Sequence, residues 1–208
     1  MTGAWAWPVA ALLLLLFRVW YDNWRGPLRP AEIERYLARA AQLPGAEHTD
    51  LDDLRAFLTS DDGREFLMVN LVRLNPQSVP DPATGTLVPA RTLLQGYLRG
   101  FMPALLRRGG HPVLVVRKVG GYIDAWQVAP DPGWTLVGLM RYRSRRDLMA
   151  LATDPRFLAA YPLKRLAISQ TFSFPAQRFM SGLGSPRSAV ALALALAAAL
   201  VHLAVLLF

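Results

Sequence analysis

Two long apolar segments, one near each end of the chain, restrict most strongly what this sequence can fold into. The first runs from Gly3 to Tyr21 and reads GAWAWPVAALLLLLFRVWY, and the second runs from Ser188 to Phe208 without a formally charged side chain. An α-helix rises about 1.5 Å per residue, so each segment is long enough to cross the roughly 30 Å hydrocarbon core of a bilayer. The sequence therefore predicts two transmembrane helices with a water-soluble stretch between them.

Aromatic residues flank the first apolar segment. Trp5 and Trp7 lie at one edge, and Trp20, Tyr21 and Trp24 lie at the other, which is typical of a helix whose ends meet the two membrane interfaces. A cleaved signal peptide is the alternative, but no basic stretch precedes the apolar run and no small-residue cleavage pattern follows it. We expect a retained anchor, although the sequence alone leaves cleavage open.

Basic side chains next to both segments indicate an orientation. Arg18, Arg25 and Arg29 lie at or after the end of the first segment, and Arg178 and Arg187 precede the second. Arginine and lysine concentrate on the cytoplasmic side of membrane proteins, so we expect the middle of the chain to be cytoplasmic. The formal net charge of +8 fits a lipid bilayer as partner. No basic helix, zinc pattern or ribonucleoprotein motif indicates nucleic acid.

The sequence contains no motif that fixes a reaction. The absence of cysteine excludes disulfides, thiolate metal sites and cysteine nucleophiles. His48, His111 and His202 are too scattered to suggest zinc or haem, so we expect no metal and no cofactor. No G-x-S-x-G elbow, Walker loop, dinucleotide-binding fingerprint or H-E-x-x-H is present. His202, inside the second apolar segment, is expected to lie near the interface or to bond a neighbouring helix, with a proton relay or haem ligand as the alternative.

Residues 25–62 predict an amphipathic helical connector. Ile33 and Leu37 share one face of a helix that Pro30 opens, and Thr49 or Asp50 caps a second short helix with the sequence LDDLRAFL. The expected boundaries are a transmembrane helix over 1–24, this connector over 25–62, an α+β domain over 63–177, a linker over 178–187 and a transmembrane helix over 188–208.

From Phe66 onward, strands alternate with helices. Branched and aromatic residues dominate the four predicted strands, which are FLMVNLVRL (66–74), PVLVVRKV (112–119), WTLVGLMRY (134–142) and SQTFSFPAQ (169–177). Between them we expect a Pro-rich loop over 75–89, a helix over 92–108, a turn-rich connection over 120–133, a helix over 144–154 and a broken helical piece over 154–167. The order β-α-β-β-α-β predicts a ferredoxin-like antiparallel sheet with its helices on one face.

The predicted strands are apolar on both sides of their alternation. A sheet that helices cover on one face only should show polar residues on the other, yet Leu, Val, Met, Phe and Trp occupy both. Something else must cover the second face. A second copy of the domain, packed sheet against sheet, is the simplest candidate, so the sequence predicts a homodimer.

Residues 65–176 resemble the small dimeric α+β-barrel proteins. The resemblance rests on FLMVNLVRL, on the helix with Tyr97 that leads to LLRRGGHPVLVVRKVGG, on WTLVGLMRY and on DPRFLAAYPLKRLAISQTFSF. It points to the uncharacterised branch with VNLLRF-like first strands. It implies the fold, a homodimer and a cavity between each sheet and its helices. Related branches include cofactor-free monooxygenases, lactone isomerases and haem enzymes, so the resemblance selects no activity.

Asn70 and His111 are the candidate catalytic residues. Asn70 lies in the first strand among apolar neighbours, where its amide could orient a carbonyl or an enolate, or could simply tie the sheet together. The Asn is typical of the branch that the chain resembles. His111 follows Gly109-Gly110 and is either a general base or a turn residue.

The candidate ligand-binding residues are aromatic, with one amide and one arginine. Ring stacking around an apolar ligand and ordinary core packing are both open for the aromatic residues. Arg141 belongs to a cluster with Arg143, Arg145 and Arg146 at the start of a predicted helix; an anion site and a solvated face are the two interpretations. The set is Asn70, Tyr97, Trp126, Trp134, Tyr161 and Arg141.

Taken together, the sequence predicts a membrane-anchored protein with a dimeric α+β-barrel domain that binds a small apolar ligand or serves assembly at the cytoplasmic membrane face. The alternative is a cofactor-free monooxygenase or isomerase that acts on an apolar, membrane-partitioned substrate. The first is favoured because no acid, base and nucleophile converge in the sequence.

Overall fold

The structure is a computed structural model that describes residues 3–179 and 184–207. The chain divides into two compact units. One consists of the two ends, Met1–Trp24 and Arg178–Phe208, and the other is Arg25–Gln177. Phe208 of the expected second span and residues 180–183 of the expected linker lie outside the described residues.

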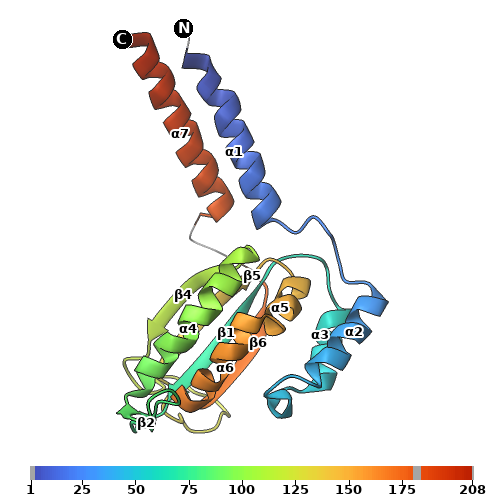
Figure 1. Cartoon of the computed structure of the whole chain (residues 1–208), viewed down its shortest axis with the longest axis vertical. Coiled ribbons are helices and arrows are strands. Elements are labelled where there is room, and N and C mark those ends of the chain that lie inside the picture. The colour runs from blue at the N-terminus through green and yellow to red at the C-terminus, as the bar shows by residue number, and fades with distance from the viewer. Residues whose placement is uncertain (1–2, 180–183, 208) are drawn as a thin grey trace. The chain divides into compact units, whose positions relative to one another are not determined.

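The unit formed by the chain ends is a pair of helices. A short 3-10 turn, Gly3–Trp5, leads into α1, Ala6–Tyr21, and the second helix is α7, Pro186–Leu207. The two helices lie side by side (Figure 1). The helical stretches Gly3–Tyr21 and Pro186–Leu207 are both long enough and apolar enough to cross a membrane. Few of their residues are buried within the protein. An apolar helix in the core of a soluble domain would instead have most of its residues buried.

Polar contacts join the paired helices. The Trp7 indole Nε1 donates a hydrogen bond to Nδ1 of His202, 3.1 Å away, so the expectation that His202 bonds a neighbouring helix is confirmed. Arg187 Nε donates to the Asp22 carboxylate at 2.6 Å. Gly3 permits the close approach, because a Cβ there would lie 2.7 Å from the His202 Cα. Small residues and interhelical hydrogen bonds are typical of paired membrane helices.

The larger unit is built on a four-stranded antiparallel sheet with the order β4-β5-β1-β6. Together with the helices between the strands, this is the predicted ferredoxin-like arrangement. The strands are β1 (Phe66–Leu74), β4 (His111–Arg117), β5 (Leu136–Tyr142) and β6 (Ile168–Ala176). Within the Pro-rich loop, β2 (Val79–Pro80) and β3 (Leu87–Val88) form a separate two-stranded ribbon.

Two helices, α4 (Ala90–Arg107) and α6 (Pro155–Ala167), lie side by side over one face of the sheet (Figure 1). The expectation of a broken helical piece over 154–167 is wrong, because α6 continues through Pro162. Proline removes one helical hydrogen bond, and close packing of α6 on α4 offsets that loss. At the contact, a Cβ added to Gly100 would come within 2.8 Å of the Ala160 Cβ.

Aromatic rings fill the layer between this face and α4. Phe66 and Tyr142, which pair across β1 and β5, stack with their ring centroids 5.3 Å apart. Tyr97 and Phe101 of α4 stack in the same way at 5.4 Å. All four are buried in one apolar cluster, so this end of the sheet is the centre of the hydrophobic core.

The connector packs onto the domain through α5 (Arg145–Ala152). It contains α2 (Pro30–Ala40), a short 3-10 turn (Ala46–His48) and α3 (Leu51–Thr59). Asp50 caps α3 by accepting hydrogen bonds from two backbone N–H groups of its first turn. Leu58 of α3 is fully buried beside Met149 of α5, so residues 25–62 share the core of the compact unit that holds the sheet.

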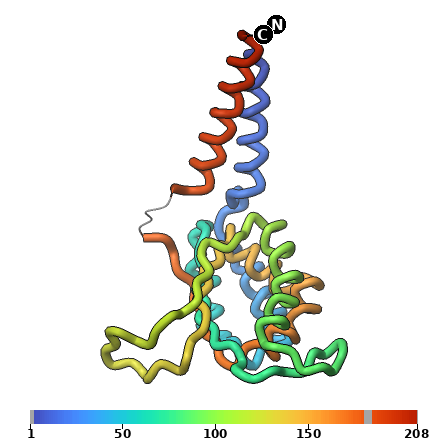
Figure 2. The backbone as a smooth tube through the Cα atoms, turned by 90° about the vertical axis from the view of Figure 1, so that its left-hand side faces the viewer, coloured from blue at the N-terminus to red at the C-terminus, as the bar shows by residue number. Residues whose placement is uncertain are grey.

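The face of the sheet opposite α4 and α6 is apolar and stays open among the described residues. Leu114, Val116, Phe172 and Phe174 on this face are between 41% and 48% exposed. Beyond β4, residues 118–135 extend from the sheet as a long loop, yellow in Figure 2. An exposed apolar face of this kind is typical of a protein interface.

Candidate functional site

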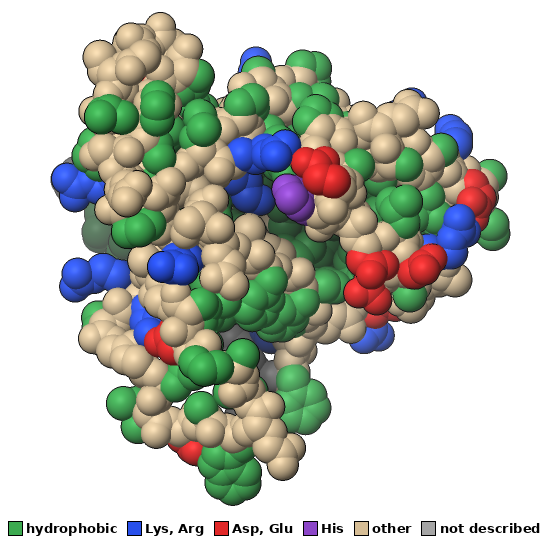
Figure 3. Space-filling model, turned by 90° about the horizontal axis from the view of Figure 1, so that it is seen from below, with side chains coloured by type: hydrophobic (Ala, Val, Ile, Leu, Met, Phe, Trp, Pro, Cys, Tyr) green, Lys and Arg blue, Asp and Glu red, His purple; other side chains and the backbone are tan. Residues whose placement is uncertain are grey.

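A cavity of about 880 Å³ lies between the helix-covered face of the sheet, α4, α6 and the connector. Alternate residues of β1, namely Met68, Asn70 and Val72, point into it, since successive side chains of a strand leave opposite faces. The space-filling view shows apolar side chains around a hollow beside a histidine (Figure 3). Its volume and mostly apolar lining fall within the range that is typical of small-molecule sites.

Asn70 is held in place by hydrogen bonds within the sheet. Its Nδ2 donates to the carbonyl oxygens of Met68 at 2.9 Å and Gly138 at 3.2 Å. Its Oδ1 accepts a hydrogen bond from Ser173 Oγ at 2.8 Å. Both amide hydrogens are therefore used inside the protein, and the residue ties β1 to β5 and β6 at the cavity wall.

Tyr97 of α4 and Tyr161 of α6 also line the cavity. Burial raises the pKa of the Tyr97 hydroxyl, so this group stays protonated at neutral pH. The Tyr161 hydroxyl occupies the space that a side chain at Gly45 would need, and Gly45 has a φ of +90°. A glycine is required there for both reasons, and this contact brings the connector against the helix that forms the cavity wall.

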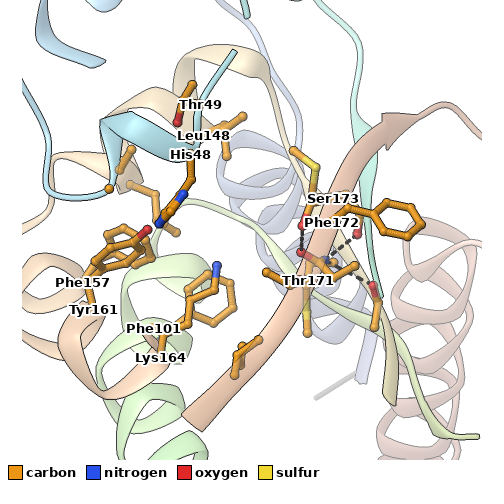
Figure 4. A pocket seen from close by; sticks show the side chains of 18 of the residues that line it. His48, Thr49, Phe101, Leu148, Phe157, Tyr161, Lys164, Thr171, Phe172 and Ser173 are labelled. Atoms are coloured by element: carbon orange, nitrogen blue, oxygen red, sulfur yellow. Dashed lines mark hydrogen bonds between the residues drawn. The ribbon is translucent and has the colours of Figure 1, made fainter. Parts of the chain in front are cut away.

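Lys164 of α6 and His48 of the connector are cavity residues that the sequence did not single out. Figure 4 shows the amine end of Lys164 pointing into the open space, with His48 beside Tyr161. Burial lowers the pKa of the Lys164 amine. No ion pair or hydrogen bond joins this amine to another described residue; its contacts are the rings of Tyr97 and Tyr161, with centroids 5.9 and 5.8 Å away.

Only one sequence signal pointed toward Lys164. The chain has just two lysines, Lys118 and Lys164, among many arginines. Lys118 forms an ion pair with Asp131, whereas Lys164 has no acidic partner among the described residues. Its spacing from Tyr161 along the helix is typical of ordinary amphipathic helices, so the cavity could not be located from the sequence.

The structure places four other candidates away from the cavity lining. Trp126 is 82% exposed on the 118–135 loop. Trp134 is buried, donates a hydrogen bond to the Tyr122 hydroxyl at 2.9 Å, and packs on Phe172. His111 pairs with Arg141 across β4 and β5. The cavity therefore brings together Asn70, Tyr97 and Tyr161 of the candidate set, but not Trp126, Trp134, His111 or Arg141.

The arginine cluster forms internal ion pairs. Arg141 binds Glu65 at 2.6 Å and the Gly109 carbonyl, and Arg146 binds Glu32 at 3.0 Å. The side chains of Arg141, Arg145 and Arg146 are buried, so the solvated-face interpretation is wrong for these three. The physical reason lies in remote acidic residues, which fold next to the cluster and neutralise it.

The cavity lining combines many apolar side chains with a smaller number of polar groups. Its polar side chains are one amine, one imidazole, three phenols, the hydroxyls of two threonines and one serine, the hydrogen-bonded Asn70 and two aspartates, Asp50 and Asp53. Asp50 is occupied as the cap of α3. Among the described residues, no three histidine, aspartate or glutamate side chains gather closely enough to hold a metal ion. An apolar molecule with a small polar end matches this lining.

Comparison with solved structures supports the fold. Two crystal structures of a protein of unknown function from Rhodopseudomonas palustris, one of them in methylated form, are 21% identical to this chain, with TM-scores of 0.53 and 0.52. The matches cover 65% and 64% of this chain and 96% of theirs. At this identity the similarity shows a shared fold and no shared activity.

More distant similarities are weaker. A dimeric protein of unknown function with a ferredoxin-like fold from Bacteroides fragilis is 13% identical, with a TM-score of 0.33, over 55% of this chain and 96% of that protein. A NIPSNAP-like domain protein from Burkholderia xenovorans is 16% identical, with a TM-score of 0.36, over 59% of this chain and 91% of that protein. No protein-family model matches the sequence, and no curated protein matches it.

Proposed function

We propose that this chain is a membrane-anchored protein whose α+β domain binds a small apolar molecule in the cavity beneath α4 and α6. The observation that carries the proposal is the cavity itself, about 880 Å³ with a mostly apolar lining. Pockets of this size bury most of the surface of a small molecule, and the burial of apolar area drives such binding.

The geometry does not favour the enzymatic alternative. A monooxygenase or isomerase that used Asn70 and His111 together would need both side chains in one site. Asn70 pairs with Gly138 of β5, while His111 pairs with Arg141. Since these β5 partners lie an odd number of positions apart, the two side chains leave opposite faces of the sheet. We therefore propose binding alone.

Native mass spectrometry of the full chain, released gently in detergent, tests this function. We expect the protein to carry a small apolar molecule. Leu94→Trp, which places a large ring in the cavity wall, should reduce the occupied fraction, while Gln95→Trp on the exposed side of the same helix should not. Equal occupancy in both variants, or wild-type protein that neither retains nor takes up added apolar compounds, would contradict the proposal.

The proposed membrane arrangement has two spans, α1 and α7, and a cytoplasmic α+β domain. Support comes from the helix pair at the chain ends and from the basic residues that flank both apolar segments, including Arg25 and Arg178. Reporters fused to the two termini should both be active on the non-cytoplasmic side. A terminal reporter that is active only in the cytoplasm would contradict this arrangement.

A homodimer is the remaining part of the proposal. The support is the apolar sheet face that α4 and α6 leave open, with its exposed Leu114, Val116, Phe172 and Phe174. A second copy offers the same apolar face, so a two-fold arrangement would cover both at once.

A further inference from the structure

The cavity contains one amine, that of Lys164, which forms no ion pair with any described residue. Lys164 lines it from α6, and no acidic side chain among the described residues lies within ion-pair distance of its amine. Elsewhere in the domain carboxylates pair with arginines, as Asp154 does with Arg107 and Arg108 at 2.5 and 2.9 Å. Lys164 therefore differs from the buried arginines Arg141, Arg145 and Arg146, each of which has an acidic partner.

The surroundings of Lys164 make an unmatched charge costly. Its amine lies against the rings of Tyr97 and Tyr161, and burial disfavours its charged form. Among the described residues, every fully buried side-chain nitrogen or oxygen has a hydrogen-bond partner. The Lys164 nitrogen has none among these residues, so it is not fully buried and remains accessible. A ligand that enters the cavity can thus reach it, since the amine points into the open space in Figure 4.

We propose that the ligand of this cavity is an amphiphile with an apolar body and one carboxylate, and that Lys164 is its counter-ion. This rests on the proposed function and names the ligand class of the same site. A carboxylate beside the amine would complete an ion pair in a largely apolar space, where charge-assisted hydrogen bonds are strongest. The Tyr97 and Tyr161 rings flank the amine, and the remaining apolar lining accommodates the body of the ligand.

The charge balance of the cavity favours a single negative charge on the ligand. Lysine binds anions as one compact charge, without the bidentate fork of arginine. The imidazole of His48 lies within 3.5 Å of the Glu47 carboxylate and is largely exposed. Asp50 and Asp53 line the connector side of the cavity and would repel a second negative charge. A monocarboxylate fits this arrangement, with its apolar body directed away from Lys164.

Equilibrium binding to the full chain in nanodiscs tests the proposal, with empty nanodiscs subtracting the amount that partitions into lipid. The probes are radiolabelled dodecanoic acid and dodecan-1-ol, which share an apolar chain and differ in the charge at one end. We expect dodecanoate to bind at least about tenfold more tightly than the alcohol, since hydrogen bonds to charged groups are worth about one to two orders of magnitude in affinity.

The two lysines of the chain supply a matched pair of variants. Lys164→Met keeps the apolar stem but removes the charge, and should weaken dodecanoate binding about tenfold or more while leaving dodecan-1-ol binding unchanged. Retained alcohol binding also shows that the cavity of the variant is intact. Lys118→Met removes the lysine paired with Asp131, which is outside the cavity lining, and should leave both affinities as they were.

The outcomes separate this inference from the proposed function. If wild-type protein binds acid and alcohol equally well, or if Lys164→Met binds dodecanoate as tightly as wild type, the carboxylate proposal is wrong and apolar binding remains. If neither probe binds, the proposed function fails with it. The comparison of acid with alcohol in the unaltered protein decides the matter even if Lys164→Met does not fold.

Discussion

At the scale of single residues, the pKa of a carboxyl in this domain depends on the partner that the tertiary structure brings next to it. Glu32 at the start of α2 accepts hydrogen bonds from Arg146 Nε and from its terminal nitrogen, both at 3.0 Å. Principally because of these bonds, the pKa of Glu32 falls from 4.5 to about 2. The pair connects residues that are far apart in sequence, so neither partner could be assigned from local pattern.

This pair predicts an acid-dependent contribution to stability. A carboxyl whose pKa is lowered on folding stabilises the protein above its unfolded pKa, and this stabilisation is lost as pH falls from about 4.5 toward 2. At pH 7, Glu32→Gln should lower the free energy of unfolding by about 1 to 3 kcal/mol, since it removes the charged partner of a buried arginine. Calorimetry of the full chain in nanodiscs should show this difference shrinking between pH 5 and about pH 2.5.

Glu34→Gln is the matched control for that experiment. Glu34 lies on the same helix and pairs with Arg55, but both side chains are more than half exposed, so its substitution should change the unfolding temperature less. A pH-independent difference between Glu32→Gln and wild type would contradict the ion-pair account.

At the scale of elements, the contact between α4 and α6 depends on one glycine. A Cβ at Gly100 would meet the Ala160 Cβ at 2.8 Å and the backbone oxygen of Arg156 at 2.9 Å. Backbone atoms cannot turn aside as the end of a flexible side chain can. The helices that cover the cavity are therefore held at a spacing that an added methyl group would change.

Two identical substitutions in α4 test this spacing. Gly100→Ala should destabilise the domain by about 1 to 3 kcal/mol through overpacking, despite the gain of about 1 kcal/mol in helix propensity. Gly96→Ala brings the same gain, but its Cβ would meet only the Cδ1 of Leu163, at 3.0 Å, so it should be neutral or stabilising. Thermal unfolding of the two variants in parallel measures the difference; a Gly100→Ala protein as stable as Gly96→Ala would contradict the tight packing.

At the scale of the whole molecule, the open sheet face is an exposed apolar surface of the kind that is typical of protein interfaces. Leu67, Val69 and Leu71 of β1 alternate with the residues that line the cavity, so their side chains leave the opposite face. Leu114 and Val116 of β4 lie on the same open face, in register with Leu139 and Val137 of β5. The sheet thus has one face that lines the cavity and another that stays open among the described residues.

The proposed dimer predicts a specific effect of a charge on that face. Leu114→Arg places a charge where Leu114 is 48% exposed and should convert the detergent-released protein from dimer to monomer at micromolar concentration. Val119→Arg, at a position 87% exposed beyond the end of β4, should leave the mass unchanged. The mass follows from light scattering with the detergent subtracted. A wild-type monomer, or a dimer that Leu114→Arg leaves intact, would rule out this interface.

The sequence by itself determined the order of the main helices and strands. The branched and apolar residues of β1, the cap Asp50 and the two long apolar segments are local signals, because each follows from the residues within one element. These signals led to the ferredoxin-like order of strands and to the terminal helix pair. The local rule failed at Pro162, because the packing of α6 on α4 offsets the hydrogen bond that proline removes.

Only the tertiary structure decided which side chains meet. It brought Asn70, Tyr97 and Tyr161 to one cavity and added Lys164, and it neutralised Arg141 and Arg146 with Glu65 and Glu32. Burial, charge pairing and cavity walls are relations between residues that lie far apart along the chain. A short stretch of sequence cannot reveal these relations. They form only when the sheet, the helices and the connector pack together and bury their apolar surfaces.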